Sequence, residues 1–238
     1  MAGGAREVSR EEHLRRWSAA HGGTSASPLV RGWLGGVRRV ASPLAAAGVP
    51  PWVVTVLGLA LGLAALAPAA AAGPGGDGGR WALLVPVLLA LAALADGLDG
   101  AVAVLGGTAS RGGAVLDAAC DRVADAAALV ALWLLGAPAL PALLALGTGQ
   151  LHEYVRARAQ AEGMTGPGVV TVSERPTRVA VAAMFALGCG LYPQSAATWA
   201  GAGAWVGAVA ALVGLAQLLA AVRRRLASPD SRDTGTGI

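Results

Sequence analysis

The sequence predicts an all-α membrane protein with six transmembrane helices, preceded by an N-terminal amphipathic helix that lies in the membrane interface. Three observations lead to this fold class. First, 55% of the 238 residues are hydrophobic and 13% are charged, whereas charged residues make up about a quarter of an ordinary soluble domain. Second, the mean hydropathy is +0.59. Third, the apolar residues gather in runs of roughly 20, long enough for a helix to cross a membrane, with Gly- and Pro-rich breaks between them.

The amphipathic helix is expected within residues 1–47, a cytoplasmic N-terminal segment. Over 28–46, apolar residues recur at helical spacing and Arg31, Arg38 and Arg39 interrupt them. This pattern is typical of a helix in the membrane interface. A soluble helix packed on the rest of the protein is the alternative.

The membrane domain is expected over residues 48–226, and the polar tail 227–238 is expected to be disordered. The six apolar segments of this domain cover roughly 52–72, 80–105, 113–136, 138–160, 176–193 and 197–222.

The arginines predict the orientation of these spans. All 18 basic residues of the chain are arginine, and the net charge is +4. If the N-terminus is cytoplasmic, nearly all arginines in or beside the spans fall on the cytoplasmic side, and Arg80 falls on the other. The positive-inside rule therefore predicts a multi-pass protein of the cell's inner membrane with both termini in the cytoplasm. Because the arginines flank apolar runs, they indicate topology and contact with anionic lipid or phosphate, and no nucleic-acid partner is expected.

Acidic residues interrupt the second and third apolar segments. Asp96 and Asp99 lie near the end of one, and Asp117, Asp121 and Asp125 lie near the start of the next. Spacings of three and four residues put each pair on one helix face, and the short connection predicts antiparallel neighbouring helices. Because acids are costly inside a membrane, they indicate a functional site, here just inside the cytoplasmic leaflet and facing the cytoplasm.

Four of these carboxylates facing one another would repel strongly unless cations joined them. Oxygen ligands suit Mg²⁺ or Mn²⁺, and two such ions close together support phosphoryl chemistry. One alternative is a salt-bridge network with Arg111 and Arg122, but two arginines supply too little positive charge. The other is a proton or ion pathway, whose acids would be spread along the pore.

A second polar group lies at the cytoplasmic ends of the fourth and fifth segments. The planar guanidinium matches phosphate oxygens. In addition, Arg175 and Pro176 mark the start of a helix, where anions are favoured. Anchoring to lipid head groups is the alternative for each residue. The group predicts a phosphate pocket and consists of Arg156, Arg158, Arg175 and Arg178.

The runs around the acids resemble the signature of the CDP-alcohol phosphatidyltransferases. D-x-x-D-G-x-x-A covers residues 96–103, and G-x-x-x-D-x-x-x-D covers 113–121 at the family's spacing. The family likewise has six spans preceded by an interfacial helix. Within it, the chain is most similar to the phosphatidylinositol phosphate synthases of actinobacteria, on the stretches 113–122, 154–159 and 174–178.

The resemblance implies an enzyme that transfers a phosphatidyl group from CDP-diacylglycerol to the hydroxyl of a small phosphorylated alcohol and releases CMP. It implies a homodimer in membrane lipid and two Mg²⁺ or Mn²⁺ ions, with Asp121 also catalytic as the acceptor of the hydroxyl proton. The implied metal ligands are Asp96, Asp99, Asp117 and Asp121; the implied donor contacts are Thr55, Gly100, Ala103, Ser110 and Arg111; the implied acceptor contacts are Arg156, Arg158, Arg175 and Arg178.

The chain departs from the family pattern at Val104, which replaces the motif arginine associated with the donor. Trp52 replaces an asparagine, and Leu218 stands where an arginine of the last span helps to bind the acceptor. Inositol phosphate and glycerol 3-phosphate both stay open as acceptors. Two further hypotheses are a relative that binds the donor but transfers inefficiently, and an ion or proton transporter.

Overall fold

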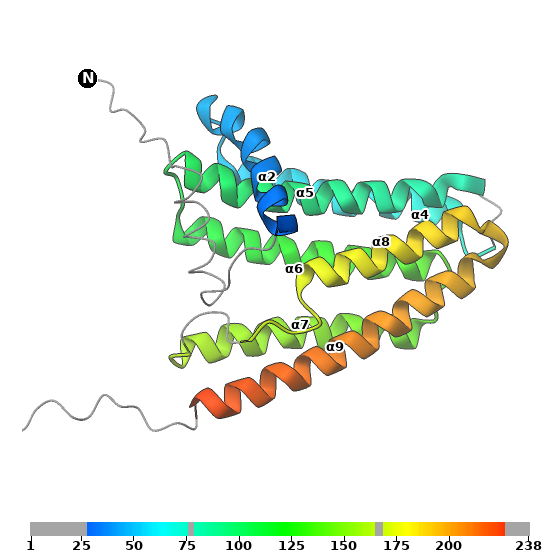
Figure 1. Ribbon diagram of the computed structural model, residues 1–238. Helices are drawn as coiled ribbons and strands as arrows, with labels where there is room; N and C mark the ends of the chain where they lie inside the picture. Colours follow the sequence, from blue (N-terminus) through cyan, green and yellow to red (C-terminus); the bar gives the residue numbers. More distant parts are fainter. Residues whose placement is uncertain (1–27, 76–78, 165–168, 227–238) are drawn as a thin grey trace, which may run out of the picture.

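The computed structural model of the protein describes residues 28–75, 79–164 and 169–226. The predicted tail and the residues before 28 lie outside this part. Within the described ranges the regular secondary structure is entirely helical (Figure 1). In chain order the elements are α2 (Pro28–Ala46), α3 (Pro51–Ala64), α4 (Leu66–Ala72), the 3₁₀ turn η1 (Gly79–Leu83), α5 (Leu84–Leu105), α6 (Arg111–Leu134), α7 (Ala139–Ala161), α8 (Arg175–Leu191), the 3₁₀ turn η2 (Pro193–Ser195) and α9 (Ala196–Leu226).

Local signals explain several helix ends. Pro51 opens α3, where its fixed φ suits a helix start and its missing N–H costs nothing. Ser110 caps α6, since its Oγ accepts a hydrogen bond of 3.0 Å from the N–H of Gly113. Between α5 and α6 the chain reverses through Gly107, whose φ of 63° favours glycine. The two helices that carry the aspartates therefore run antiparallel, as the sequence predicts.

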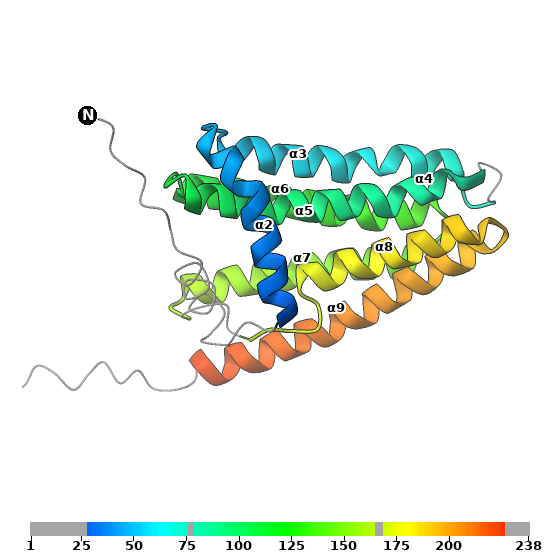
Figure 2. The ribbon, with the colours of Figure 1, turned by 45° about the horizontal axis from the view of Figure 1, so that its top comes forward.

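The helices α3 to α9 lie lengthwise beside one another, and α2 crosses them (Figure 2). Val37 and Ala41 of α2 are buried in one cluster with Val54 of α3 and Leu98 and Val102 of α5. Polar residues such as Arg39 lie on exposed positions of α2. The helix is therefore amphipathic and packs on the bundle through its apolar side.

The main core is built largely of small residues, and the large apolar side chains point outward. Ala65, Ala131, Ala186 and Ala204 are fully buried. Leu143, in contrast, is 64% exposed, and many other leucines and valines of the bundle are exposed like it. Small residues let helix backbones approach closely, while an apolar outer surface suits lipid.

By length and apolarity, three helical segments of the described part can cross a membrane: Pro51–Ala72, Arg80–Leu105 and Pro193–Leu226. The predicted third, fourth and fifth spans are also helical but are shorter or more charged than these three segments. The helix α8 has 17 residues, while α6 and α7 carry several charged side chains each. The six spans therefore stay a prediction.

Candidate active site

The aspartates of α5 and α6 come together where these helices pack against α3. One carboxylate oxygen from each of Asp96, Asp117 and Asp121 lies within 4.8 Å of the others. Asp99 lies beside them, and all four line one small cavity together with Thr55. The structure thus brings together the four predicted metal ligands around a single cavity.

The orientation of Asp99 is fixed from both sides. Its Oδ2 accepts a hydrogen bond of 2.6 Å from the hydroxyl of Thr55, and its Oδ1 accepts one of 2.5 Å from the N–H of Gly100. Asp99 is 5% exposed. Thr55 and Gly100 were predicted to contact the donor, and the structure shows that they also hold a carboxylate of the cluster.

The residues present fit a divalent cation. The donor set consists of carboxylate oxygens, which are the ligands that Mg²⁺ and Mn²⁺ prefer. Among the described residues, the buried Oδ1 of Asp117 has no hydrogen-bond partner. Buried polar atoms are nearly always satisfied, so an unpaired carboxylate oxygen beside other carboxylates indicates a ligand position.

An open pocket of about 860 Å³ adjoins the cluster, between the start of α3, the end of α5 and the start of α6. Asp99 and Asp117 lie on its wall and connect it to the small cavity. The pocket also includes four of the predicted donor contacts: Thr55, Gly100, Ala103 and Ser110.

The walls of this pocket, as far as the described residues form them, carry no arginine. Val104, which replaces the family's motif arginine, and Trp52 both line it. Arg111, the fifth predicted donor contact, is exposed at the start of α6 and is not among the lining residues. The charged groups that face the pocket are therefore acidic.

Arg175 reaches into the aspartate cluster from the start of α8. Its Nη1 pairs with Asp96, its Nη2 lies 2.9 Å from Asp121 Oδ1, and its Nε lies 3.5 Å from Asp125 Oδ1. Arg175 therefore offsets part of the negative charge of the cluster. The salt-bridge alternative had placed Arg111 and Arg122 in this position, but Arg122 pairs with Asp125 and Glu153.

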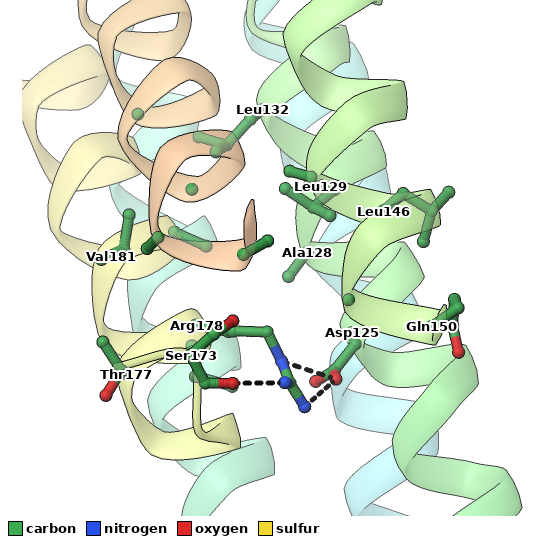
Figure 3. A pocket seen from close by; sticks show the side chains of 18 of the residues that line it. Asp125, Ala128, Leu129, Leu132, Leu146, Gln150, Ser173, Thr177, Arg178 and Val181 are labelled. Carbon is green, nitrogen blue, oxygen red and sulfur yellow. Dashed lines mark hydrogen bonds and ion pairs between the residues drawn. The ribbon is translucent and has the colours of Figure 1, made fainter. Parts of the chain in front are cut away.

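Arg178, one turn further along α8, is held by three partners. Asp125 Oδ2 lies 3.1 Å from its Nε and 2.9 Å from its Nη2 (Figure 3). Glu153 Oε1 accepts from both Nη atoms at 3.2 and 3.1 Å. The carbonyl of Ser173 accepts a hydrogen bond of 2.6 Å from Nη1.

Arg156 and Arg158 occupy different surroundings. Arg156 makes a forked pair with Glu174 at 2.9 and 2.7 Å. Arg158 is 64% exposed and pairs with Glu162 at the end of α7. The structure thus brings Arg156, Arg175 and Arg178 into partly buried ion pairs and places Arg158 on the surface.

Glu174 ties the segment before α8 to the bundle. Besides Arg156, it binds the N–H of Thr171 at 2.8 Å and the Thr171 hydroxyl at 3.0 Å. Burial opposes ionisation of this carboxyl, but the hydrogen bonds from Arg156 and Thr171 outweigh it and lower its pKa. Thr171 also contacts His152, which is fully buried, with its Nε2 at 3.1 Å from the hydroxyl. His152 is thus a buried residue that packs against Thr171.

Two other features of this region were missed or left open by the sequence. Asp125 and Glu153 pair with the predicted arginines; Asp125 is among the acids of the predicted third span, but the sequence predicts no role for either residue. Asp125 continues the spacing of four residues from Asp117 through Asp121, and that spacing could have identified it. Leu218, where the resemblance implies an arginine, is fully buried, so an apolar side chain fills this position.

Comparisons with known proteins identify the family of this chain. The family model for CDP-alcohol phosphatidyltransferases matches residues 49–216. The chain is 37% identical over 195 residues to the phosphatidylinositol phosphate synthase of Mycobacteroides abscessus, covering 77% of this chain and 82% of that one. It is 38% identical over 196 residues to the synthase of Mycolicibacterium smegmatis, covering 78% and 83%.

Solved structures of a phosphatidylinositol phosphate synthase are also similar to this chain. The phosphatidylinositol phosphate synthase of Mycobacterium tuberculosis with CDP-DAG bound superposes with a TM-score of 0.65 at 29% identity, covering 85% of this chain and 98% of that one. The same enzyme in complex with manganese and citrate also gives a TM-score of 0.65, at 30% identity, covering 84% and 93%. The chain therefore belongs to the CDP-alcohol phosphatidyltransferase family and is a phosphatidyltransferase enzyme of that family.

Proposed function

We propose that the protein transfers a phosphatidyl group from CDP-diacylglycerol to the hydroxyl of inositol phosphate and releases CMP. The observation that carries this proposal is the aspartate cluster, which opens on one side to a large pocket and contacts an arginine-rich helix start on the other. The relatives named phosphatidylinositol phosphate synthase support the acceptor. The relative with CDP-DAG bound supports the donor.

Two Mg²⁺ or Mn²⁺ ions would be held by Asp96, Asp99, Asp117 and Asp121. When bound, they would supply positive charge to the diphosphate of the donor and to the charge that develops during transfer. Thr55 would keep Asp99 in its ligating orientation through the 2.6 Å hydrogen bond. The manganese bound to a solved relative supports this choice of metal.

The donor's nucleotide would lie in the open pocket, with its diphosphate at Asp99 and Asp117 and its acyl chains in lipid. Gly100, Ala103 and Ser110 form a wall of small residues there. Their size lets the backbone come close to a ligand. Because the walls lack an arginine, the metal ions and the amides at the start of α6 would carry most of the charge neutralisation.

The acceptor would enter from the side of α8. Arg175 and Arg178 would hold its phosphate, with Arg156 nearby, and Asp121 would accept the proton of the attacking hydroxyl. Arg175 already lies 2.9 Å from Asp121. A phosphate held by this arginine therefore keeps the rest of the acceptor close to the proposed base, which is the positioning that the reaction needs.

We further propose that six spans cross the membrane, with α2 in the cytoplasmic interface and membrane lipid around a homodimer. The connection from α5 to α6 and the end of α9 lie at the same end of the bundle (Figure 1). Arg111 and Arg223–Arg225 are at this end, while Arg80 follows the connection at the opposite end. This charge distribution supports cytoplasmic termini and a site that faces the cytoplasm.

The test uses purified protein in detergent with labelled CDP-diacylglycerol and Mg²⁺ or Mn²⁺. Inositol phosphate, glycerol 3-phosphate and unphosphorylated inositol are supplied in parallel, and CMP is measured. We expect metal-dependent CMP release with inositol phosphate and much less with unphosphorylated inositol. CMP release with glycerol 3-phosphate alone would identify the other acceptor. Donor binding without CMP release would instead favour a transfer-deficient relative, and ion flux in liposomes without nucleotide would favour a transporter.

A further inference from the structure

We propose that Asp125 is a positioning residue, which aligns Arg175 and Arg178 so that they meet the phosphate of the acceptor beside Asp121. This inference rests on the proposed function, because it assigns a purpose to the two arginines. Asp125 lies outside the three-residue carboxylate group that could hold a metal ion. Its contacts are with arginines, so its role differs from that of the cluster.

Its place on α6 makes Asp125 a link between two parts of the site. It follows Asp121 by four residues, so both side chains lie on the same helix face. Across from this face is the first turn of α8, which carries Arg175 and Arg178 three residues apart. Asp125 is 9% exposed, so these contacts are formed largely away from water.

Asp125 meets both arginines at the Nε edge of the guanidinium. Its Oδ2 accepts a hydrogen bond of 3.1 Å from the Nε of Arg178 and lies 2.9 Å from the Nη2 of the same residue. Figure 3 marks both contacts. The Oδ1 of Asp125 faces the Nε of Arg175 at 3.5 Å. Among the described residues, neither Asp125 Oδ1 nor Arg175 Nε has a hydrogen-bond partner. A small movement that shortens the distance between these two atoms would satisfy both.

A guanidinium is planar and rigid, so a carboxylate on its Nε edge determines where the two Nη groups point. For Arg175 they point to Asp96 and Asp121, at the reacting centre. For Arg178 they also reach Glu153 and the Ser173 carbonyl. Without Asp125 both arginines would keep their charge but lose this shared alignment.

The surrounding charges explain why alignment is needed. Three arginines contact Asp125, namely Arg122, Arg175 and Arg178, and Glu153 is the other carboxylate that faces Arg122 and Arg178. Removing Asp125 altogether would leave buried positive charge poorly matched. Asp125→Asn also removes the charge, but it is the informative substitution because it keeps the shape and one acceptor oxygen.

For Asp125→Asn we expect the KM for inositol phosphate to rise about tenfold or more, the scale of a lost charge-assisted hydrogen bond. The KM for CDP-diacylglycerol should change much less, because Asp125 is not among the residues that line the open pocket. Asp125→Glu should recover part of the acceptor KM, because it restores a carboxylate. The matched control is Glu162→Gln, which removes a carboxylate from an exposed arginine pair on α7 and should change none of these values.

Binding of inorganic phosphate, measured by isothermal titration calorimetry with Mg²⁺ present, separates this inference from the proposed function. If the wild type binds phosphate and Asp125→Asn binds it at least about tenfold more weakly, the inference holds even without turnover. Equal phosphate binding, an unchanged acceptor KM, or an equal rise in the KM values of donor and acceptor would overturn it.

A folding defect in Asp125→Asn would be visible as a lower unfolding temperature in detergent. In that case Arg178→Lys is the test variant in place of Asp125→Asn. Lysine keeps the positive charge but lacks the Nε edge that contacts Asp125. We expect the same selective rise in the acceptor KM and the same loss of phosphate binding. A wild-type acceptor KM together with wild-type phosphate binding in Arg178→Lys would overturn the inference.

Discussion

Asp121 is the residue on which the proposed proton transfer depends. Its Oδ1 lies 2.9 Å from Arg175, and it shares the cluster with Asp96 and Asp117. Replacement by asparagine keeps the volume but removes the base and a metal ligand. We expect Asp121→Asn to reduce CMP release at least about a hundredfold, as loss of a general base does. The unfolding temperature in detergent should stay close to that of the wild type, and unchanged CMP release would reject the role.

A substitution of Thr55 tests whether metal binding by the aspartate cluster depends on the orientation of Asp99. Thr55→Val removes the hydrogen bond to Asp99 without changing the size of the side chain. Partners that orient a ligating side chain typically contribute about 10- to 100-fold in metal affinity or activity. We therefore expect a higher Mn²⁺ concentration for half-activation. Thr55→Ser, which keeps the hydroxyl, is the control, and equal Mn²⁺ dependence in both variants would contradict the assignment.

A substitution of Val104 tests whether the open pocket, whose described walls lack arginine, binds the donor as proposed. Val104 lines the pocket near the end of α5, together with Gly106. In Val104→Arg, a guanidinium would face the diphosphate of the donor. We expect the KM for CDP-diacylglycerol to fall by roughly tenfold, the scale of one charge-assisted hydrogen bond. Val104→Leu serves as the apolar control, and a donor KM that rises or stays constant in Val104→Arg would contradict this view of the pocket.

At the scale of elements, the segment before α8 is held to α7 and α9 by few but specific contacts. Glu174 binds Arg156 and Thr171, and the N–H of Val172 donates to Gln217 of α9 at 3.0 Å. A Cβ at Gly214 would lie 2.5 Å from the Cβ of Ser173, so glycine lets α9 approach this segment. The start of α8, with its two arginines, is thereby fixed relative to the bundle.

This arrangement predicts a pH dependence of stability. The pKa of Glu174 is lowered below its ordinary 4.5 in the folded protein. Its contribution is therefore fully present above pH 4.5 and is lost as the pH falls through the lower folded value. Glu174→Gln should lower the unfolding temperature at pH 7, and the difference from wild type should shrink below pH 4.5. A difference that stays constant down to pH 3 would contradict this role.

The helices themselves were predictable because long apolar runs with Gly- and Pro-rich breaks leave few other structures. The antiparallel pair α5 and α6 and its aspartates followed from spacing and a short connection. The partners of the arginines could not be predicted in this way. Local periodicity predicts which face of its helix a residue occupies, but not which other helix covers that face. Arg175 therefore meets Asp96 and Asp121 across helices, whereas Arg111 is not among the residues that line the open pocket.

The whole molecule has an uneven distribution of charge between its two ends, which predicts its orientation in the membrane. Arg80→Cys and Leu226→Cys place a thiol at opposite ends of the bundle. We expect a membrane-impermeant maleimide to label the first in intact cells lacking an outer-membrane barrier, and the second only after the membrane is opened. The two native cysteines are buried and should give little background. Labelling of both positions from outside would contradict the predicted topology.

The most direct measurement of the central claim is Mn²⁺ binding to the purified protein, followed by electron paramagnetic resonance. With CDP-diacylglycerol present, we expect two ions to bind per chain. Asp117→Asn should lose at least one of them, whereas the surface variant Glu162→Gln should keep both. Mn²⁺ binding that is the same in the wild type and in Asp117→Asn would contradict a metal site built from these four aspartates.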